Sequence, residues 1–277
     1  MGGIFSKAPV QTGMNAPKHL LEAWEEVRLW AAKARRLVLL TDFDGTLVRI
    51  QKDPHQVRLS RALRQSLSVL VNKGITVGVI SGRTMDDIRS RVHLDGIWYV
   101  GSHGYTIRPP KGRPTSLVTP EGKRLVAAAR RNLIRQLSGS DGIYVEAKSV
   151  SVAVHYRSAP WPSQVRGLES VRNILRENSG LRLLTGKKVW ELLPDSAESK
   201  WSGVQYVFRD IPASQRLVFY FGDDESDEEV FARLDGVSVA VGKHRQTNAR
   251  YYLNSPSEVH QFLKALQQFA NVPSSGC

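Results

Sequence analysis

Short apolar runs alternate with helical periodicity in the first hundred residues. Residues 37–40, 75–80 and 97–100 are runs rich in Leu, Val and Ile, which is typical of strands buried on both faces of a parallel sheet. Apolar residues recur at helical spacing over about 20–32, 60–72 and 85–91, which predicts helices there. The order strand, helix, strand, helix, strand predicts a doubly wound parallel sheet.

The pattern changes near residue 108, where a stretch rich in Pro and Gly begins. Helical spacing over 122–138 and 163–178, a strand or hairpin over 144–156, and Leu- and Val-rich strands over 181–193 give the order αββαββ. This order predicts helices on one face of an antiparallel sheet. The earlier pattern then resumes, with a helix over 200–208, strands over 217–221 and 237–241, and a helix over 257–269.

The predicted fold is therefore α/β, with a Rossmann-like, doubly wound core and an inserted α+β cap domain. We assign residues 18–107 and 195–277 to the core and residues 108–194 to the cap. Residues 1–17 contain Gly, Pro, Asn and Ser and are expected to be a disordered leader. Their start fits the N-myristoylation pattern Met-Gly-x-x-x-Ser at Gly2, although a simple leader is the interpretation that we favour.

Composition narrows the partners of this 277-residue chain. The net charge is +13, but the basic residues are spread along the sequence without a nucleic-acid-binding signature, so we expect attraction to small anionic substrates and no nucleic acid. No apolar run approaches a membrane span, and we expect no membrane partner. Cys277 is the one cysteine, so no disulfide can form within the chain. These features favour a cytoplasmic location and a monomer.

Two carboxylates follow the first apolar strand. Asp42 and Asp44 are spaced i, i+2 at its carboxyl end, where parallel sheets bind ligands. Asp-Gly is also a common turn signal, which would explain Asp44 but not Asp42. Two neighbouring carboxylates repel each other unless a cation intervenes. The pair therefore predicts a divalent metal with oxygen ligands.

Other polar residues fall at matching positions of the predicted core. Ser81 ends the second strand and could donate a hydrogen bond to a phosphoryl oxygen, or cap a helix. Lys200 opens the helix after the insertion and suits a phosphate, although a lone Lys is more often solvated. The acidic run 223–229 begins where an apolar strand ends. Such a run is usually a solvated face, but at this position it favours a metal site.

In this order the motifs resemble those of the haloacid dehalogenase superfamily of phosphatases. The resemblance implies that Asp42 is the nucleophile, that Asp44 is the general acid and base, and that Ser81, Gly82 and Lys200 bind phosphate. It also implies a Mg²⁺ cofactor. The implied metal residues are Asp42, Asp44 through its backbone carbonyl, Asp223, and Asp227, with Asp227 or Asp224 ordering the metal's water shell or Lys200.

From about Leu37 to Leu266 the chain also resembles the trehalose-6-phosphate phosphatase family. The shared strings are Ser81-Gly82-Arg83, Gly101-Ser102-His103-Gly104, Glu146-Ala147-Lys148, His155-Tyr156-Arg157, Gly186-Lys187 followed by Glu191, and Gly222 through Phe231. A disaccharide needs carboxylates that accept from its hydroxyls and amines that donate to them. The resemblance implies a sugar phosphate substrate, contacted by Arg83, His103, Gly104, Glu146, Lys148, His155, Arg157 and Glu191.

Three departures from the family pattern bear on the substrate. This chain has Thr106 where an acidic residue is usual, Leu193 where Arg is usual, and Trp201 where Gly is usual. The first two concern the cap hinge and the substrate edge. We expect hydrolysis of trehalose 6-phosphate, and two alternatives stay open. One is the same chemistry on sucrose 6-phosphate or a glucosylglycerol phosphate, and the other is a non-catalytic regulator that has kept the fold.

Overall fold

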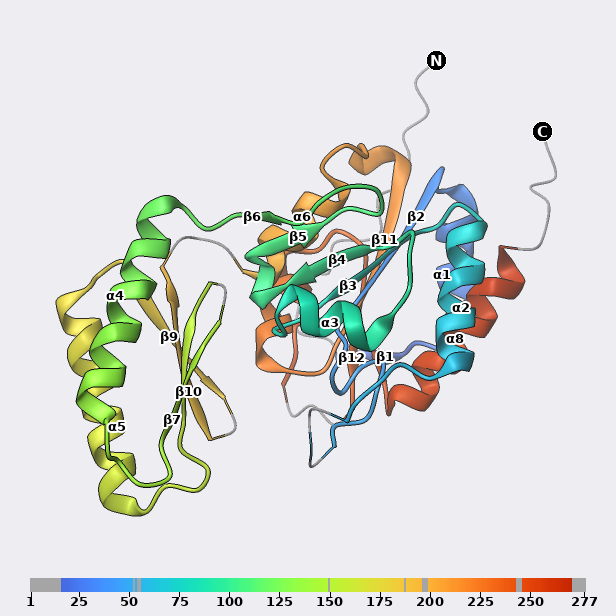
Figure 1. Cartoon of the computed structure of the whole chain (residues 1–277). Helices are drawn as coiled ribbons and strands as arrows, with labels where there is room; N and C mark the ends of the chain where they lie inside the picture. The colour runs from blue at the N-terminus through green and yellow to red at the C-terminus, as the bar shows by residue number, and fades with distance from the viewer. Residues whose placement is uncertain are drawn as a thin grey trace. The chain divides into compact units, whose positions relative to one another are not determined.

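The computed structural model describes residues 16–51, 53, 56–148, 150–186, 188–195, 199–242 and 246–270. The predictions for residues 1–15, including Gly2, and for Cys277 lie outside the described residues. The chain forms two compact units (Figure 1). We call Ser116–Glu198 the cap unit and the remainder, up to Thr115 and from Ser199 onward, the core unit.

A nine-stranded sheet in the order β1-β13-β12-β11-β2-β3-β4-β5-β6 forms the centre of the core unit. Neighbours from β1 through to β4 pair in parallel, while β5 pairs antiparallel with β4. The strands are β1 Lys18–His19, β2 Arg36–Thr41, β3 Thr76–Ile80, β4 Trp98–Gly101, β5 Thr106–Arg108, β6 Thr115–Ser116, β11 Arg216–Gly222, β12 Val237–Val241 and β13 Tyr251–Leu253.

Helices lie on both faces of this sheet, which confirms the predicted doubly wound fold. Helices α1, α2 and α8 pack on the face that presents Leu39 of β2 and Phe219 of β11. Helix α6 contacts β3 and β4, where Gly203 lies against Val100 on the other face. The helices are α1 Trp24–Lys33, α2 Arg61–Asn72, α3 Met85–Val92, α6 Lys200–Phe208, α7 Glu228–Arg233 and α8 Pro256–Phe269, with 3₁₀ turns η1 Ser102–Gly104, η2 Ala213–Gln215 and η3 Glu225–Asp227.

The cap unit is a four-stranded antiparallel sheet in the order β7-β8-β10-β9. Val152, Val154, Trp190 and Leu192 point from one sheet face into an apolar cluster with both helices of the unit. This is the helix and strand order that the sequence predicts. The elements are α4 Pro120–Leu137, β7 Tyr144–Ala147, β8 Val152–His155, α5 Trp161–Glu177, β9 Leu181–Gly186 and β10 Val189–Pro194.

The two units divide the chain a few residues after each of the predicted domain boundaries. The core unit extends to Thr115, beyond the predicted boundary at residue 108, because β6 continues the core sheet after β5. The cap unit likewise includes Asp195, just beyond the predicted boundary after residue 194, and the Asp195 N–H donates to the Gly180 carbonyl at 2.7 Å. The Pro- and Gly-rich stretch that signals a boundary is therefore partly core sheet.

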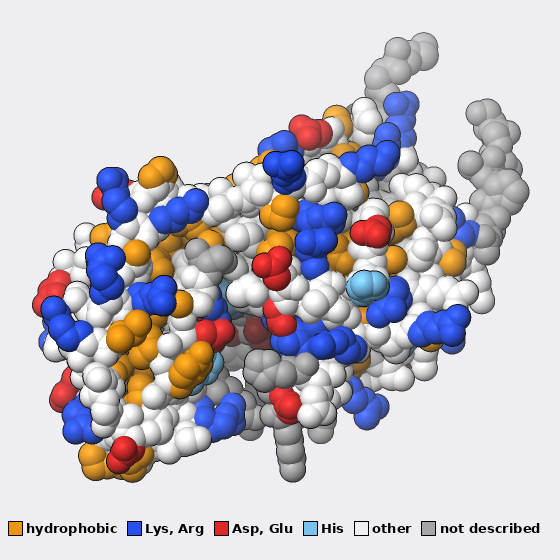
Figure 2. Space-filling view, in the orientation of Figure 1, with side chains coloured by type: hydrophobic (Ala, Val, Ile, Leu, Met, Phe, Trp, Pro, Cys, Tyr) orange, Lys and Arg blue, Asp and Glu red, His pale blue; other side chains and the backbone are white. Residues whose placement is uncertain are grey.

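Basic and acidic side chains are interspersed on the surface of both units. On the face drawn in Figure 2, Lys and Arg side chains are scattered over each unit with Asp and Glu among them. Within the described ranges, no helix combines the length and the apolar character needed to cross a bilayer.

Candidate active site

Strands β11, β2, β3 and β4 are neighbours and run parallel. The residues that follow them therefore gather at one edge of the sheet. Asp42 follows β2, Ser81 follows β3, and Asp223 follows β11. The sequence pattern predicts candidate residues at these three strand ends, and the sheet order makes these strands neighbours.

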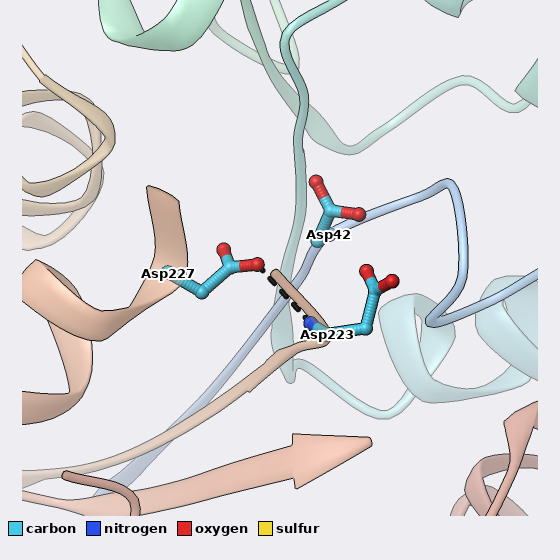
Figure 3. A group of neighbouring side chains, drawn as sticks. All are labelled: Asp42, Asp223 and Asp227. Atoms are coloured by element: carbon cyan, nitrogen blue, oxygen red, sulfur yellow. Dashed lines mark hydrogen bonds between the residues drawn. The ribbon is translucent and has the colours of Figure 1, made fainter. Parts of the chain in front are cut away.

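Asp42, Asp223 and Asp227 form an acidic cluster, with one carboxylate oxygen of each lying within 4.8 Å of the others (Figure 3). Asp42 is 5% exposed and Asp227 is fully buried. The Asp42 N–H donates to the Phe221 carbonyl of β11 at 2.8 Å, and the Asp223 N–H donates to Asp227 Oδ2 at 3.1 Å. Backbone hydrogen bonds thus hold the three carboxylates close together.

Lys200 is the cation that the structure places in this acidic cluster. Its Nζ donates to Asp42 Oδ1 at 3.0 Å and to Asp227 Oδ1 at 2.8 Å, and lies 3.6 Å from Asp224 Oδ1. The side chain is only 3% exposed. Burial disfavours the charged amine, but Asp227 and Asp42 outweigh this and raise the Lys200 pKa well above its usual value. Lys200 is therefore an ammonium ion directed at Asp42.

Asp227 holds Lys200 in place. Its Oδ1 accepts from Lys200 and from the Tyr220 hydroxyl at 2.5 Å, and its Oδ2 accepts from the backbone N–H groups of Asp223 and Asp224. Four donors thus engage both carboxylate oxygens. This arrangement favours the predicted role of Asp227 in ordering Lys200. The Tyr220 contact had no sequence signal, because Tyr220 reads as one more apolar residue of a buried strand.

The electrostatics of the acidic cluster fit a divalent cation. Burial, followed by the neighbouring carboxylates, raises the pKa of Asp42 well above its usual range, although Lys200 opposes this. Burial and the charges of Asp224 and Asp227 raise the pKa of Asp223 to about 7. One ammonium ion does not neutralise this group of carboxylates. Hard oxygen ligands with excess negative charge are the donor set that Mg²⁺ or Ca²⁺ prefers.

Two glycines make room for the carboxylates. A Cβ on Gly45 would lie 1.9 Å from Asp223 Oδ2, and a Cβ on Gly222 would lie 2.2 Å from Asp227 Cγ. Gly45 also has a φ of +87°, where only glycine is unstrained. Thr46 next to it donates from its Oγ1 to Asp223 Oδ1 at 3.2 Å. The sequence offers Asp44 and Gly45 as a turn signal, and only the structure shows that Gly45 and Thr46 contact Asp223.

The Asp44 carboxylate pairs with the Arg83 guanidinium. Arg83 Nε donates to Asp44 Oδ2 at 2.5 Å and Nη2 donates to Oδ1 at 2.7 Å. A third donor, Nη1, contacts Asp87 Oδ2 at 2.8 Å. The structure thus engages the Asp44 carboxylate with a guanidinium, and its side chain is not one of the three that form the acidic cluster. It also places Arg83, which the sequence assigns to substrate, on another protein residue.

The remaining core residues are close together around the ends of β3 and β4. Ser81 is 2% exposed and its Oγ accepts from the Arg83 N–H at 3.1 Å. The His103 ring lies against Gly82, since a Cβ there would be 2.4 Å from His103 Cε1. Gly104 has a φ of +102°, and a Cβ on it would lie 1.9 Å from the Ser199 carbonyl oxygen. Gly82 and Gly104 thus allow close packing beside the acidic cluster.

Four of the predicted sugar-binding residues of the cap unit pair with each other, through one ion pair and one histidine–carboxylate contact. Lys148 Nζ lies 2.9 Å from Glu191 Oε2, while the Ser151 hydroxyl donates to Glu191 Oε1 at 2.5 Å. His155 Nε2 lies 2.8 Å from Glu146 Oε2.

Strand register brings these two pairs together within the cap unit. Glu146 and Glu191 are both opposite Ala153, one on each neighbouring strand. A small residue thus separates two carboxylates on one sheet face. Arg157 lies beyond β8 and is exposed.

Comparisons with known proteins identify the family and support the fold. The family model described as trehalose-phosphatase matches residues 40–257. An uncharacterized glycosyl hydrolase of Mycobacterium tuberculosis is 36% identical over 247 residues, which cover 84% of this chain but only 18% of that protein. The chain thus spans less than a fifth of that relative.

A trehalose-phosphate phosphatase of the same organism is 33% identical, covering 95% of this chain and 69% of that one. Among solved structures, the C-terminal domain of Candida albicans trehalose-6-phosphate phosphatase superposes with a TM-score of 0.73 at 21% identity. This match covers 92% of this chain and 98% of that one. It supports the fold.

Proposed function

The chain belongs to the trehalose-phosphatase family, whose model matches most of its length, and we propose that it is a Mg²⁺-dependent phosphatase acting on trehalose 6-phosphate. The observation that carries the proposal is Lys200, buried and bonded to both Asp42 and Asp227 beside Asp223. A buried nucleophilic carboxylate, a fixed ammonium ion and a second acidic group are what transfer of a phosphoryl group to an aspartate requires.

Asp42 and Asp223 are the side chains that would hold Mg²⁺, together with the backbone carbonyl of Asp44. The raised pKa values of Asp42 and Asp223 support this assignment, because a bound cation would favour their ionised forms. When bound, the ion offsets the negative charge that the nucleophile and the phosphate dianion bring together.

The reaction proceeds in two steps through the side chains of the core unit. Asp42 attacks phosphorus, an aspartyl-phosphate forms, and the bond from phosphorus to the sugar oxygen breaks. Asp44, which has to enter this step with a proton on one carboxyl oxygen, gives that proton to the sugar oxygen. In the second step Asp44 takes a proton from water as the water oxygen attacks phosphorus, and the bond from phosphorus to Asp42 breaks to release phosphate and the free Asp42 carboxylate. Ser81 and Lys200 hold the phosphoryl oxygens, so much of the rate enhancement comes from positioning and charge.

The cap unit would select the sugar. Glu146 and Glu191 are separated by Ala153 in the sheet register, and Lys148 pairs with Glu191. Carboxylates that accept and an amine that donates suit the hydroxyls of a disaccharide. The chain's departures at Thr106 and Leu193 leave sucrose 6-phosphate and a glucosylglycerol phosphate as alternative substrates. The non-catalytic alternative is disfavoured because Asp42, Asp44, Lys200 and Asp223 are all present.

The test is phosphate release from a panel of sugar phosphates, measured with Mg²⁺ and after exhaustive chelation. We expect turnover of trehalose 6-phosphate above that of the other sugars, loss of turnover on chelation, and recovery with Mg²⁺. Asp42→Asn should lose more than about a hundredfold in kcat, since an amide cannot form the aspartyl-phosphate.

Circular dichroism checks that the Asp42→Asn protein is folded, as expected for a nearly isosteric change. Wild-type phosphate release by folded Asp42→Asn protein would rule out the mechanism. Full activity after chelation would rule out the metal. A preference for another sugar would keep the chemistry and replace the substrate.

A further inference from the structure

We propose that Asp87 is a positioning residue for the acid–base step: it fixes Arg83, which in turn holds both carboxylate oxygens of Asp44. The inference rests on the proposed function, because it takes Asp44 as the group that protonates the leaving oxygen. Asp87 is on α3 and is not among the residues that the family resemblance implies.

A continuous chain of short contacts connects Asp87 to Asp44. Arg83 uses Nε and Nη2 on Asp44, at 2.5 and 2.7 Å, and Nη1 on Asp87 Oδ2 at 2.8 Å. Arg91 anchors Asp87 in turn, with Nε on Oδ2 at 2.8 Å and Nη2 on Oδ1 at 2.5 Å. Each carboxylate thus accepts two or more charged donors, and paired donors of this kind fix orientation as well as charge.

Local sequence explains this alignment. Positions 83, 87 and 91 are spaced by four residues, so their side chains fall along one side of α3 and its approach. The Thr84 hydroxyl caps the helix by accepting the Asp87 N–H at 3.4 Å. The Arg83 guanidinium also lies 5.8 Å from the centre of the Phe43 ring, an attractive cation–π geometry. The backbone and a ring therefore limit where Arg83 can point.

Negative and positive side chains alternate in the series Asp44, Arg83, Asp87 and Arg91, and Arg91 at the end of the series is buried. Asp44 and Asp87 side chains are 35% and 33% exposed, Arg83 is 14% exposed, and Arg91 is 4% exposed. Arg91 also donates from Nη1 to the Val57 carbonyl at 2.9 Å. Removal of the Asp87 charge would leave two neighbouring guanidinium groups without the carboxylate between them, and like charges repel.

The hold of Arg83 on Asp44 matters because the Asp44 side chain is about one third exposed and leaves room for rotation. A general acid has to lie within hydrogen-bond reach of the oxygen that it protonates. Arg83 supplies that restraint only while its own guanidinium is held. Asparagine at position 87 offers one acceptor oxygen where the carboxylate offers two, and its amide N–H groups would face a guanidinium N–H.

The experiment compares two substrates of Asp87→Asn in the full chain with Mg²⁺. An alkyl phosphate such as trehalose 6-phosphate needs a proton on its leaving oxygen, whereas p-nitrophenyl phosphate, with its acidic phenol, needs little. We expect kcat for the alkyl phosphate to fall roughly tenfold more than kcat for the aryl phosphate. Complete loss of a general acid typically lowers the rate about 10²–10⁴-fold, and loss of its positioning should cost less. Asp87→Glu keeps the charge and should restore part of this ratio.

The ratio is insensitive to partial unfolding, because a smaller folded fraction lowers both rates equally. Asp210→Asn is the matched control, as Asp210 pairs with Arg209 on the surface at 3.4 Å and should leave the ratio unchanged. One result would overturn the role of Asp87 alone: Asp87→Asn lowers kcat equally for both substrates, while Asp44→Asn lowers kcat much more for the alkyl phosphate than for the aryl phosphate. If Asp44→Asn lowers kcat equally for the two substrates, the acid role of Asp44 in the proposed function is overturned instead.

Discussion

Gly104 is a residue without a side chain that packs against the start of α6, the helix that begins with Lys200. Its φ is +102°, and a Cβ there would lie 1.9 Å from the Ser199 carbonyl oxygen and 3.2 Å from the backbone nitrogen of Lys200. Ser199 is the N-cap of α6, and Lys200 is the first residue of that helix. Gly104 therefore allows the backbone of η1 to pack directly on the first residues of α6, the helix that carries Lys200. Sequence resemblance assigns Gly104 to substrate, whereas the structure gives it this packing role.

Gly104→Ala should therefore reduce phosphate release from every substrate, large or small. The positive φ alone costs about 1–2 kcal/mol in a residue with a Cβ, and the clash with Ser199 has to move α6 and Lys200. We expect kcat to fall more than about tenfold alike for trehalose 6-phosphate and p-nitrophenyl phosphate. A loss confined to the sugar phosphate would instead support the substrate contact that the sequence predicts.

Gly74→Ala separates strain from displacement in this prediction. Gly74 has a φ of +78° and no atom within 4 Å of the added Cβ. It should lower Tm through strain alone and leave kcat unchanged. If Gly74→Ala reduced kcat as much as Gly104→Ala does, a general loss of stability would explain both.

At the level of the helix and strand, most of the core was predictable because buried parallel strands are continuous apolar runs. The helix at 200–208 and the strand at 237–241 have the predicted bounds. The short strands β1, β5, β6 and β13 were missed, since two or three residues carry no periodicity. Pairing with a neighbouring strand forms them, as when Lys18 and His19 align with Tyr251 and Tyr252.

The candidate site was predictable in part for the same reason. Asp42, Lys200 and Asp223 each begin or end a recognisable element, so their convergence follows from parallel sheet topology. Their partners had no comparable signal. Tyr220 is one residue of an apolar strand, and Asp87 is one acidic residue of an amphipathic helix. Only the distances to Asp227 and Arg83 show what each one holds.

Strand β1 is also held by a side-chain contact that predicts a pH dependence. Glu258, in the first turn of α8, accepts from the Asn254 N–H at 2.8 Å and lies 2.9 Å from His19 Nε2 of β1. Burial favours its protonated form, but these hydrogen bonds outweigh burial and lower the Glu258 pKa below 4.5. A carboxyl whose folded pKa is lowered stabilises the fold above its unfolded pKa, and this stability is lost as pH falls through the folded value.

Glu258→Gln should thus lower Tm at pH 7 by roughly 2–4 °C, which corresponds to about 1 kcal/mol for a charged hydrogen-bond acceptor. The difference from wild type should shrink as pH falls through the lowered folded pKa of Glu258, because the carboxyl then becomes neutral like the Gln amide. Thermal melts from pH 3 to 8 measure it. Glu25→Gln, at an exposed ion pair with Arg28, is the control and should change Tm little at any pH. A Glu258→Gln difference that is constant with pH would contradict the charge argument.

At the scale of the whole molecule, the two units have separate apolar clusters. Residues of β2, β3, β11 and β12 pack with α1, α2 and α8 in the core unit, and residues of β8 and β10 pack with α4 and α5 in the cap unit. Each unit thus has the means to retain its own sheet and helices. The proposed metal ligands, Asp42 and Asp223, both belong to the core unit, so cation binding should stabilise one unit and not the other.

Hydrogen exchange of the whole chain with and without Mg²⁺ tests this separation. A ligand that binds only the folded state adds about 2.7 kcal/mol at a hundred times its Kd. Peptides from residues 36–46, 200–208 and 216–233 should exchange more slowly with Mg²⁺, by severalfold or more. Peptides from 144–155 and 181–194 should be unchanged. The Asp223→Asn protein is the control, and it should lose the Mg²⁺ effect in all peptides. Equal protection of the cap peptides would mean that the two units open together, whereas no protection anywhere would contradict Mg²⁺ binding at Asp42 and Asp223.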